Sequence, residues 1–366
     1  MPVRIFRDAH GQPPTGKHMK SLAYLAALAA LSTSAVAQSN VTLYGLIDSG
    51  IRIDKTNAGT GLSVGGGMSS GSRWGLRGSE DLGGGLRAVF TLEGGFGADT
   101  GVSGQGGRLF GRQSYVGLSS DAGTLTFGRQ YTPEFWTTLA MDPLQYGTVG
   151  NINNVFPRVV IRNDNAIVYT SPKFGGLEVR LLYAPGETNV AGVDKNAGNN
   201  LGGSVQYAAG GLTVNYAHQQ IRGTTNVGAT PKEKHNTVGA SYDFGVVKAY
   251  ASYGTFENDA ATNKVDFGNY YLALESKIGP TSTVMASFGR IDDKAASNRD
   301  GRLLSLAYVY QLSRRTDLHF AVARMTNNAN AQYLLTDSTS TGLQSSTTVP
   351  LGFDPTAVGI GIRHRF

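Results

Sequence analysis

The sequence predicts an all-β fold, a transmembrane β-barrel of sixteen antiparallel strands. Three observations support this prediction. The hydrophobic pattern after residue 40 has a period of two, short and long polar connections alternate, and the segments that could form strands number sixteen. An even number of antiparallel strands, with short turns at one end and long loops at the other, is typical of barrels of the bacterial outer membrane.

The first 37 residues are predicted to be a secretory signal peptide. Lys20 precedes an apolar stretch at residues 22–31 (LAYLAALAAL), and residues 35–37 (AVA) have the small-x-small pattern of a cleavage site. The apolar stretch is too short to span a membrane as a helix. We expect initiation at Met19, and a long region ahead of the apolar stretch is the alternative that stays open. Residues 38–366 are expected to form a single barrel domain.

The first and last strands show the alternation most clearly. In residues 41–54 one face is mainly apolar and the other carries the charged side chains. In the final strand Ile360, Ile362 and the terminal Phe366 share one face, and Arg363 and Arg365 share the other. The long connections between strands are expected at residues 55–69, 97–107, 131–162, 185–199, 221–235, 257–266, 291–300 and 326–355.

A secreted soluble β-protein is the alternative that this alternation leaves open, since one face of its sheets would be wet. Two features favour the barrel. The polar faces carry large charges while the apolar faces are thin and rich in Gly, and Tyr and Phe cluster beside turns, as in the aromatic girdles of membrane barrels. After residue 37 no stretch approaches the ~18 apolar residues that a spanning helix needs.

The composition limits the chemistry available to the chain. It has 366 residues, 50 Gly and no Cys, which excludes disulfides, thiolate catalysis and Cys-based metal sites. The signal segment carries four of the 32 Lys and Arg residues and one of the 26 acids, so residues 38–366 have a net charge of +3. This small excess gives no indication of nucleic-acid binding, and we expect none.

No motif in the chain indicates catalysis, and we expect no enzyme, no cofactor and no metal site. A phosphate loop is absent from the sequence. The G-x-S-x-G pattern occurs at residues 61–65 (GLSVG) and 67–71 (GMSSG), but no helical pattern follows either segment, as a nucleophile turn would require. The His residues outside the signal segment lack metal-ligand spacing; they are His218, His235, His319 and His364. One Ser–His pair brought together in space stays open, because Ser is abundant.

Several motifs resemble the trimeric general-diffusion porins of Gram-negative bacteria, most closely those of β-proteobacteria. Residues 72–86 (SRWGLRGSEDLGGGL) are similar to the second-strand motif of that family. The supporting motifs follow in family order: residues 41–45 (VTLYG), 108–118 (RLFGRQSYVGL), 123–131 (GTLTFGRQY), 165–172 (NAIVYTSP) and the terminal Phe366. Together they extend from the first strand to the last residue.

The resemblance implies a homotrimer in the outer membrane that forms a water-filled channel for passive diffusion of small hydrophilic solutes and ions. It implies contact with outer-membrane lipid and lipopolysaccharide, and an assembly signal at Phe366 for the barrel-assembly machinery. Two alternatives stay open. One is a substrate-specific channel or adhesin-like barrel, for which residues 185–199 and 326–355 are long enough. The other is an outer-membrane barrel enzyme.

The connection at residues 131–162 is expected to fold into the barrel. It follows the fifth strand, where the third long loop of such porins narrows the lumen, and long loops in compact domains are usually functional. By motif position the resemblance implies a basic wall of Arg73, Arg77, Arg112 and Arg162, which we expect Arg129 to join. The wall is expected to face Asp142 of the loop, and Glu134 is the second candidate acid, although many relatives have other residues at that position.

The balance of these charges predicts a modest preference for anions. A ring with excess positive charge raises the local anion concentration. The loop also departs from the family pattern, because Thr137 and Thr138 stand where an acid is common. This departure weakens the acidic side of the expected constriction.

Overall fold

The computed structural model describes residues 40–187, 194–223, 231–260, 264–338 and 349–366. The predicted signal peptide lies outside these residues. The described ranges hold seventeen β-strands and three short helices. None of these helices has the length and apolar character required to cross a membrane.

The elements follow one another as a series of strands interrupted by short helices. The strands are β1 (Asn40–Thr56), β2 (Gly59–Gly66), β3 (Arg73–Gly83), β4 (Leu86–Gly95), β5 (Gln113–Ser120), β6 (Gly123–Tyr131), β7 (Arg162–Thr170), β8 (Leu177–Ala184), β9 (Asn200–Ala209), β10 (Leu212–Arg222), β11 (Lys232–Asp243), β12 (Lys248–Asn258), β13 (Asp266–Ile278), β14 (Ser282–Ile291), β15 (Gly301–Gln311), β16 (Thr316–Asn327) and β17 (Thr356–Arg365). The helices are α2 (Gly104–Gly107), α3 (Pro133–Ala140) and the 3-10 turn η1 (Ile152–Asn154).

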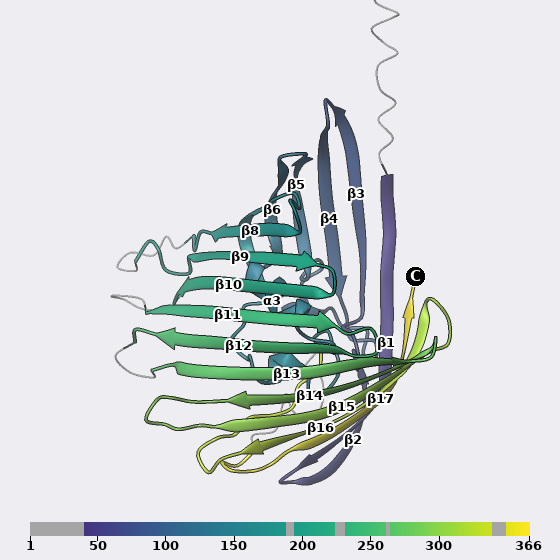
Figure 1. Cartoon of the computed structure of the whole chain (residues 1–366), viewed down its shortest axis with the longest axis vertical. Helices are drawn as coiled ribbons and strands as arrows, with labels where there is room; N and C mark the ends of the chain where they lie inside the picture. Colours follow the sequence, from purple (N-terminus) through teal and green to yellow (C-terminus); the bar gives the residue numbers. More distant parts are fainter. Residues whose placement is uncertain (1–39, 188–193, 224–230, 261–263, 339–348) are drawn as a thin grey trace, which may run out of the picture. The chain divides into compact units, whose positions relative to one another are not determined.

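The strands close into one antiparallel barrel. Each strand from β3 onward pairs with the next in the chain, as Figure 1 shows for β9 to β13. The last strand, β17, pairs with β1. Closure satisfies the backbone hydrogen bonds within the sheet, which a structure surrounded by lipid requires.

One barrel strand is interrupted. Both β2 and β3 pair with β1, the first along residues 49–56 and the second along residues 40–46. They are therefore two halves of one strand, so the seventeen segments make the sixteen strands that the sequence predicts. The expected long connection at residues 55–69 is corrected here, because β2 occupies most of it and the hairpin turns at residues 57–58.

The interruption, residues 67–72, is held by a carboxylate on β1. The backbone N–H groups of Ser69 and Ser70 donate to Oδ2 of Asp48 at 3.0 and 2.8 Å. The Ser72 hydroxyl also contacts the backbone of Asp48. Unpaired backbone groups that would be costly inside a barrel are thereby satisfied.

The outer surface of the strands is apolar, as a lipid-facing surface must be. In β15, for example, Leu304 and Leu306 are exposed, whereas the alternating Ser305 and Ala307 are buried. The inward residues are buried because a loop covers this part of the inner wall.

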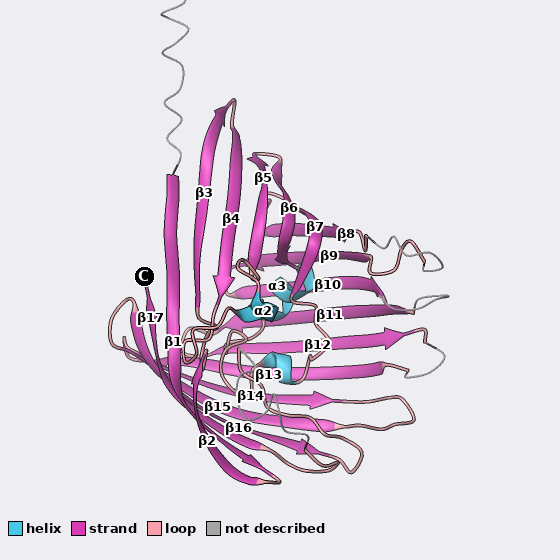
Figure 2. Ribbon diagram, turned by 180° about the vertical axis from the view of Figure 1, so that it is seen from behind, coloured by secondary structure: helices cyan, strands magenta, loops and turns pink. Residues whose placement is uncertain are grey.

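That loop is residues 132–161, called the inner loop here, which joins β6 to β7. Figure 2 shows its helix α3 enclosed by the strands. The helix begins where Thr132 accepts a hydrogen bond from the Phe135 N–H at 3.0 Å, with Pro133 in its first turn. The inward-folded third loop that the resemblance implies is therefore present.

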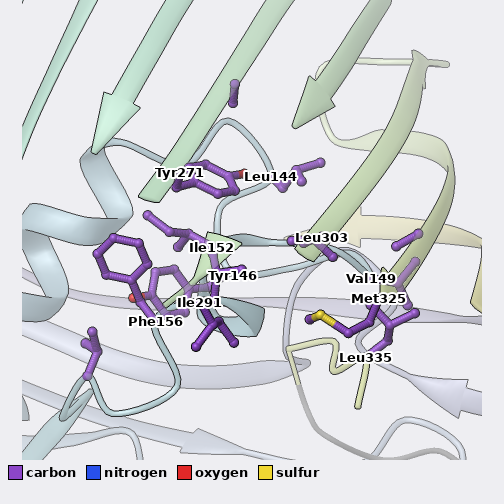
Figure 3. Close-up of a cluster of buried hydrophobic side chains, with 14 of the residues drawn as sticks. Leu144, Tyr146, Val149, Ile152, Phe156, Tyr271, Ile291, Leu303, Met325 and Leu335 are labelled. Carbon is purple, nitrogen blue, oxygen red and sulfur yellow. The ribbon is translucent and has the colours of Figure 1, made fainter. Parts of the chain in front are cut away.

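The inner loop is attached to the wall by an apolar core inside the barrel (Figure 3). Its Ile152, Val155 and Phe156 are fully buried, and the Phe156 ring meets the Phe256 ring of β12 at 5.8 Å. Burying one such side chain contributes roughly 1.5–3 kcal/mol. A hydrophobic contact surface of this size explains why the loop lies on the wall rather than in water.

Glycines on the wall provide room for the side chains of the loop. A Cβ atom at Gly254 would overlap the Phe156 ring, and one at Gly289 would lie 2.7 Å from Val155. On β11, Gly239 faces Met141 in the same manner. The high glycine content therefore serves close approach of loop to wall, besides the turns.

Candidate functional site

The inner loop and the opposite wall enclose a cavity of about 560 Å³. The wall side comes from β1 and β3 to β7. The loop side is lined by Phe135, Trp136, Leu139, Gln145, Tyr146, Asn153 and Ile161. Asp337 and Ser338, from the connection between β16 and β17, complete the lining.

Four of the five predicted wall arginines lie together on this cavity: Arg73, Arg77, Arg112 and Arg162. They are called the arginine wall below. Arg73 donates through Nε to the Gly71 carbonyl at 2.9 Å. The guanidinium of Arg77 lies over the Tyr44 ring, 5.1 Å from its centroid.

Tyr131, at the end of β6, organises the other two arginines of the wall. Its hydroxyl accepts from Nη2 of Arg112 at 2.8 Å and from Nη2 of Arg162 at 2.9 Å. Arg162 also lies over the Tyr131 ring, 4.5 Å from its centroid. Nε of Arg112 donates to Glu93 at 2.7 Å, so this arginine is held from both sides. Fixed donors of this kind keep a charged surface in one geometry.

The fifth predicted arginine, Arg129, does not line the cavity. A register shift between Gly128 and Gln130 interrupts the pairing of β6 with β7 at this position. Arg129 donates to Asp164 at 2.6 Å, and Arg108 binds the same carboxylate. Leu125 and Phe127, which share its sheet face by strand alternation, are exposed. We therefore leave Arg129 out of the arginine wall.

The inward arginines of the last strand form a separate group. Arg363 and Arg365 both bind Asp317, at 3.1 and 2.8 Å, and Arg363 also donates to the Ser70 hydroxyl. Neither lines the cavity beside the arginine wall.

Asp142 turns its carboxylate into the loop. It is 2 % exposed and accepts from the N–H groups of Leu144 and Tyr146 at 3.0 and 2.8 Å. The Ile152 N–H at 3.3 Å and the Tyr271 hydroxyl of β13 at 2.8 Å add two further bonds. The carboxylate thus folds residues 142–152 around itself and fastens them to the wall. Burial raises its pKa to about 6, although the four hydrogen bonds favour the charged form.

Glu134 fastens the other end of the loop. It is 1 % exposed and contacts Nδ1 of His235, on β11, at 3.0 Å. Nε2 of the same ring lies 2.8 Å from Glu233, which also pairs with Arg158. Because an ionised carboxylate only accepts hydrogen bonds, these two contacts require a proton on each ring nitrogen. His235 is therefore a cationic bridge between the helix α3 and the wall.

The consequence is a one-sided charge distribution. Among the described residues that line the cavity, the inner loop contributes aromatic, aliphatic and amide side chains but no carboxylate. The two acids on the lining, Glu93 and Asp337, are paired with Arg112 and Arg52. The described ranges contain no group of three or more residues that could hold a metal ion.

A family model described as Gram-negative porin matches residues 25–330. The chain belongs to the Gram-negative porins. It is 32 % identical to an outer membrane porin protein of Bordetella pertussis, over 95 % of this chain and 100 % of that one. It is 34 % identical to the outer membrane porin protein 32 of Delftia acidovorans, over 95 % and 99 %.

Solved structures agree with the fold of this porin. An anion-selective porin from Comamonas acidovorans superposes with a TM-score of 0.79 at 30 % identity, over 90 % of this chain and all of the other. OmpT of Vibrio cholerae, at 18 % identity and a TM-score of 0.70 over 90 % and 99 %, shares the fold. The porin is thus an outer-membrane channel for passive diffusion, and its relatives are channels rather than enzymes.

Several residues that lie beside the arginine wall are not among those predicted from the sequence. Glu93 and Tyr131 point inward on their strands, but the alternation of side chains along a strand does not show that they bind arginine. Trp136 belongs to a helix that a search for period-two patterns passes over. The Thr-Pro-Glu sequence at residues 132–134 is a helix-start signal that could have found it.

The buried Asp142 predicts a pH dependence of stability. Burial raises the pKa of Asp142 from 3.8 to about 6, so the folded state binds a proton here more tightly than the unfolded state. The stabilisation of the folded protein by this proton is fully present below about pH 4 and is lost as the pH rises through about 6. Between about pH 5 and pH 7.5, wild type should therefore lose thermal stability relative to Asp142→Asn, which cannot titrate. Thermal unfolding followed by circular dichroism checks this. Asp121→Asn, in an exposed turn, is the control, and an unchanged difference across this range would contradict the prediction.

Proposed function

We propose that this porin forms an anion-preferring diffusion pore, narrowed between the arginine wall and the inner loop. One observation carries the proposal: four arginines face the cavity, while both predicted loop acids, Asp142 and Glu134, point into the loop and its attachment to the wall. Those acids then act by holding the loop rather than by balancing the arginines. The similarity to a porin described as anion-selective supports the same conclusion.

The preference follows from electrostatics. Low-dielectric walls concentrate the field of the arginines in the narrow water path, which raises the local concentration of anions. Fixed charges that line a channel set its ion preference. The preference should weaken in concentrated salt, because the Debye length falls from ~10 Å at 0.1 M to ~3 Å at 1 M.

Removing two charges from the arginine wall should reduce the preference. Arg73 and Arg77 are suitable because neither forms an ion pair with an acid among the described residues. We expect Arg73→Gln with Arg77→Gln to lower the anion-to-cation permeability ratio about twofold or more. The zero-current potential across a planar bilayer in a dilute KCl gradient measures this ratio.

The matched control is Arg302→Gln, which removes an arginine from the exposed outer face of β15. It should leave the potential unchanged. Cation preference in wild type, or equal shifts in the double variant and the control, would sink the proposal.

We also propose that three copies associate through the outer face of β17, β1 and β2. OmpT of Vibrio cholerae has been solved in a trimer form. On β1 and β2 the exposed large apolar side chains are all aliphatic: Val41, Leu43, Ile47, Ile51, Ile53, Leu62 and Val64. On β8 to β15 they include the aromatics that suit a lipid interface: Tyr183, Tyr207, Tyr216, Tyr242, Tyr270, Phe288, Tyr308 and Tyr310. The remaining outer face is proposed to contact outer-membrane lipid and lipopolysaccharide.

A charge on the proposed interface should prevent trimer formation. Leu62, on β2, is 70 % exposed and is the fourth residue from the loop end of its strand. Leu304 has the same position on β15 and is 64 % exposed. After refolding in detergent, Leu62→Arg should yield monomers by cross-linking, whereas Leu304→Arg should still yield trimers. Trimers from both variants would place the interface elsewhere.

We further propose that Phe366 is the signal read by the barrel-assembly machinery. Its backbone exchanges two hydrogen bonds with Gly45, at 3.1 and 3.0 Å, and its ring lies where a side chain on Gly45 would be. The aromatic ring is 46 % exposed on the outer face.

Deleting Phe366 should lower the yield of heat-resistant trimer in outer membranes several-fold. Refolding of the same variant in detergent separates assembly in the cell from stability, because a lost recognition signal does not affect refolding. Normal yield in cells would refute the role of Phe366.

A further inference from the structure

A tryptophan is exposed in the lumen beside the arginine wall. Trp136 is 38 % exposed, although its neighbours Phe135 and Thr137 in α3 are buried. It lines the cavity of the arginine wall and also a second cavity of about 300 Å³ on the other side of α3.

The indole is held in place by neighbouring aromatic rings. Its ring packs edge-on to Tyr131 at 5.2 Å and tilted against Phe135 at 5.8 Å. The helix that carries it is attached to the wall through Glu134 and His235, and the Thr138 hydroxyl bonds to the Tyr146 hydroxyl at 2.6 Å. A side chain fixed in this manner loses little further freedom when a solute contacts it.

Charged side chains lie on both sides of the indole. On one side Tyr131 connects it to Arg112 and Arg162, through the hydrogen bonds already described. On the other side the guanidinium of Arg180, on β8, lies 5.7 Å from the indole centroid and is paired with Glu178. The lining of that second cavity is mixed in charge, with Lys248 beside Glu275 and Asp142. A solute that passes α3 on the side of the arginine wall therefore meets an excess of positive charge and an aromatic surface together.

We propose that the constriction of this porin favours organic anions that carry an aromatic ring, and that Trp136 is the residue that confers this specificity. The carboxylate of such a solute is attracted by the arginines while its ring stacks on the indole. This inference rests on the proposed anion preference and adds to it a distinction between anions of equal charge and size. The attraction between two aromatic rings exceeds the hydrophobic contribution of the area that they bury. We expect this extra attraction to raise the relative permeability of an aromatic anion about two- to tenfold.

Two probes separate aromatic stacking from general hydrophobic contact. Benzoate and cyclohexanecarboxylate have the same charge and similar dimensions, but only benzoate is aromatic. Bi-ionic zero-current potentials, with sodium chloride on one side and either salt on the other, give each permeability relative to chloride. In wild type we expect the benzoate value to exceed the cyclohexanecarboxylate value at least twofold. Trp136→Leu should bring the two values together.

The sequence contains two tryptophans, which supplies a matched control. Trp74, on β3, is exposed to a similar extent, but it does not line either cavity. Trp74→Leu should leave the ratio of the two permeabilities unchanged. Equal permeabilities in wild type, or an unchanged ratio in Trp136→Leu, would overturn the inference.

A second measurement avoids dependence on the folding of Trp136→Leu. In the Trp74→Phe variant Trp136 is the only tryptophan, so the tryptophan fluorescence reports contact between Trp136 and added solutes. 4-Nitrobenzoate should quench it saturably, whereas a nitrobenzyl trimethylammonium cation should quench it weakly and linearly. Linear quenching by both would overturn the inference.

The potassium chloride potential distinguishes the two proposals. If wild type prefers anions in a KCl gradient but does not distinguish benzoate from cyclohexanecarboxylate, the role of Trp136 fails and the arginine wall stands. If the KCl potential shows no anion preference, the proposed function itself fails.

Discussion

The docking of the inner loop onto one half of the inner wall is the interaction on which the rest of this porin depends. Apolar loop residues fill the space above wall glycines, so that Phe156 and Val155 approach the sheet more closely than any wall side chain would permit. This contact holds the loop against one part of the wall and leaves a cavity between the loop and the arginine wall.

A carboxylate in the inner loop can either neutralise the arginine wall or hold the loop in its fold, and Asp142 and Glu134 hold the loop. Asp142 collects three backbone N–H groups and a tyrosine hydroxyl, and Glu134 binds an imidazole on the wall. A carboxylate used in this manner is shielded from the water path, so its charge offsets little of the field of the arginines. The electrostatic character of the lumen is therefore a by-product of how the loop is anchored.

Much of the fold could be predicted from the sequence, because strand alternation and turn spacing are local. The sixteen strands, their antiparallel order and the inward loop all follow from pattern and resemblance, and the structure confirms them. What could not be predicted depends on contacts between distant residues. The direction of Arg129 is decided by a register shift, the burial of Asp142 by Tyr271 of a distant strand, and the role of His235 by a glutamate about a hundred residues earlier. The roles of the individual site residues stay predictions.

The interruption between β2 and β3 also bears on how such a sequence can change in length. Residues 67–72 contact β1 through Asp48, and Gly67 accepts a hydrogen bond from Ser338 at 2.6 Å, while Ser338 donates its N–H to Gly147 of the inner loop. A side chain on Gly147 would overlap the carbonyl of Ser69. Three segments that are remote in the chain thus meet at one point. Evolution can lengthen a hairpin tip such as residues 57–58 without disturbing this junction, but a single residue gained or lost within residues 67–72 would displace all three segments together.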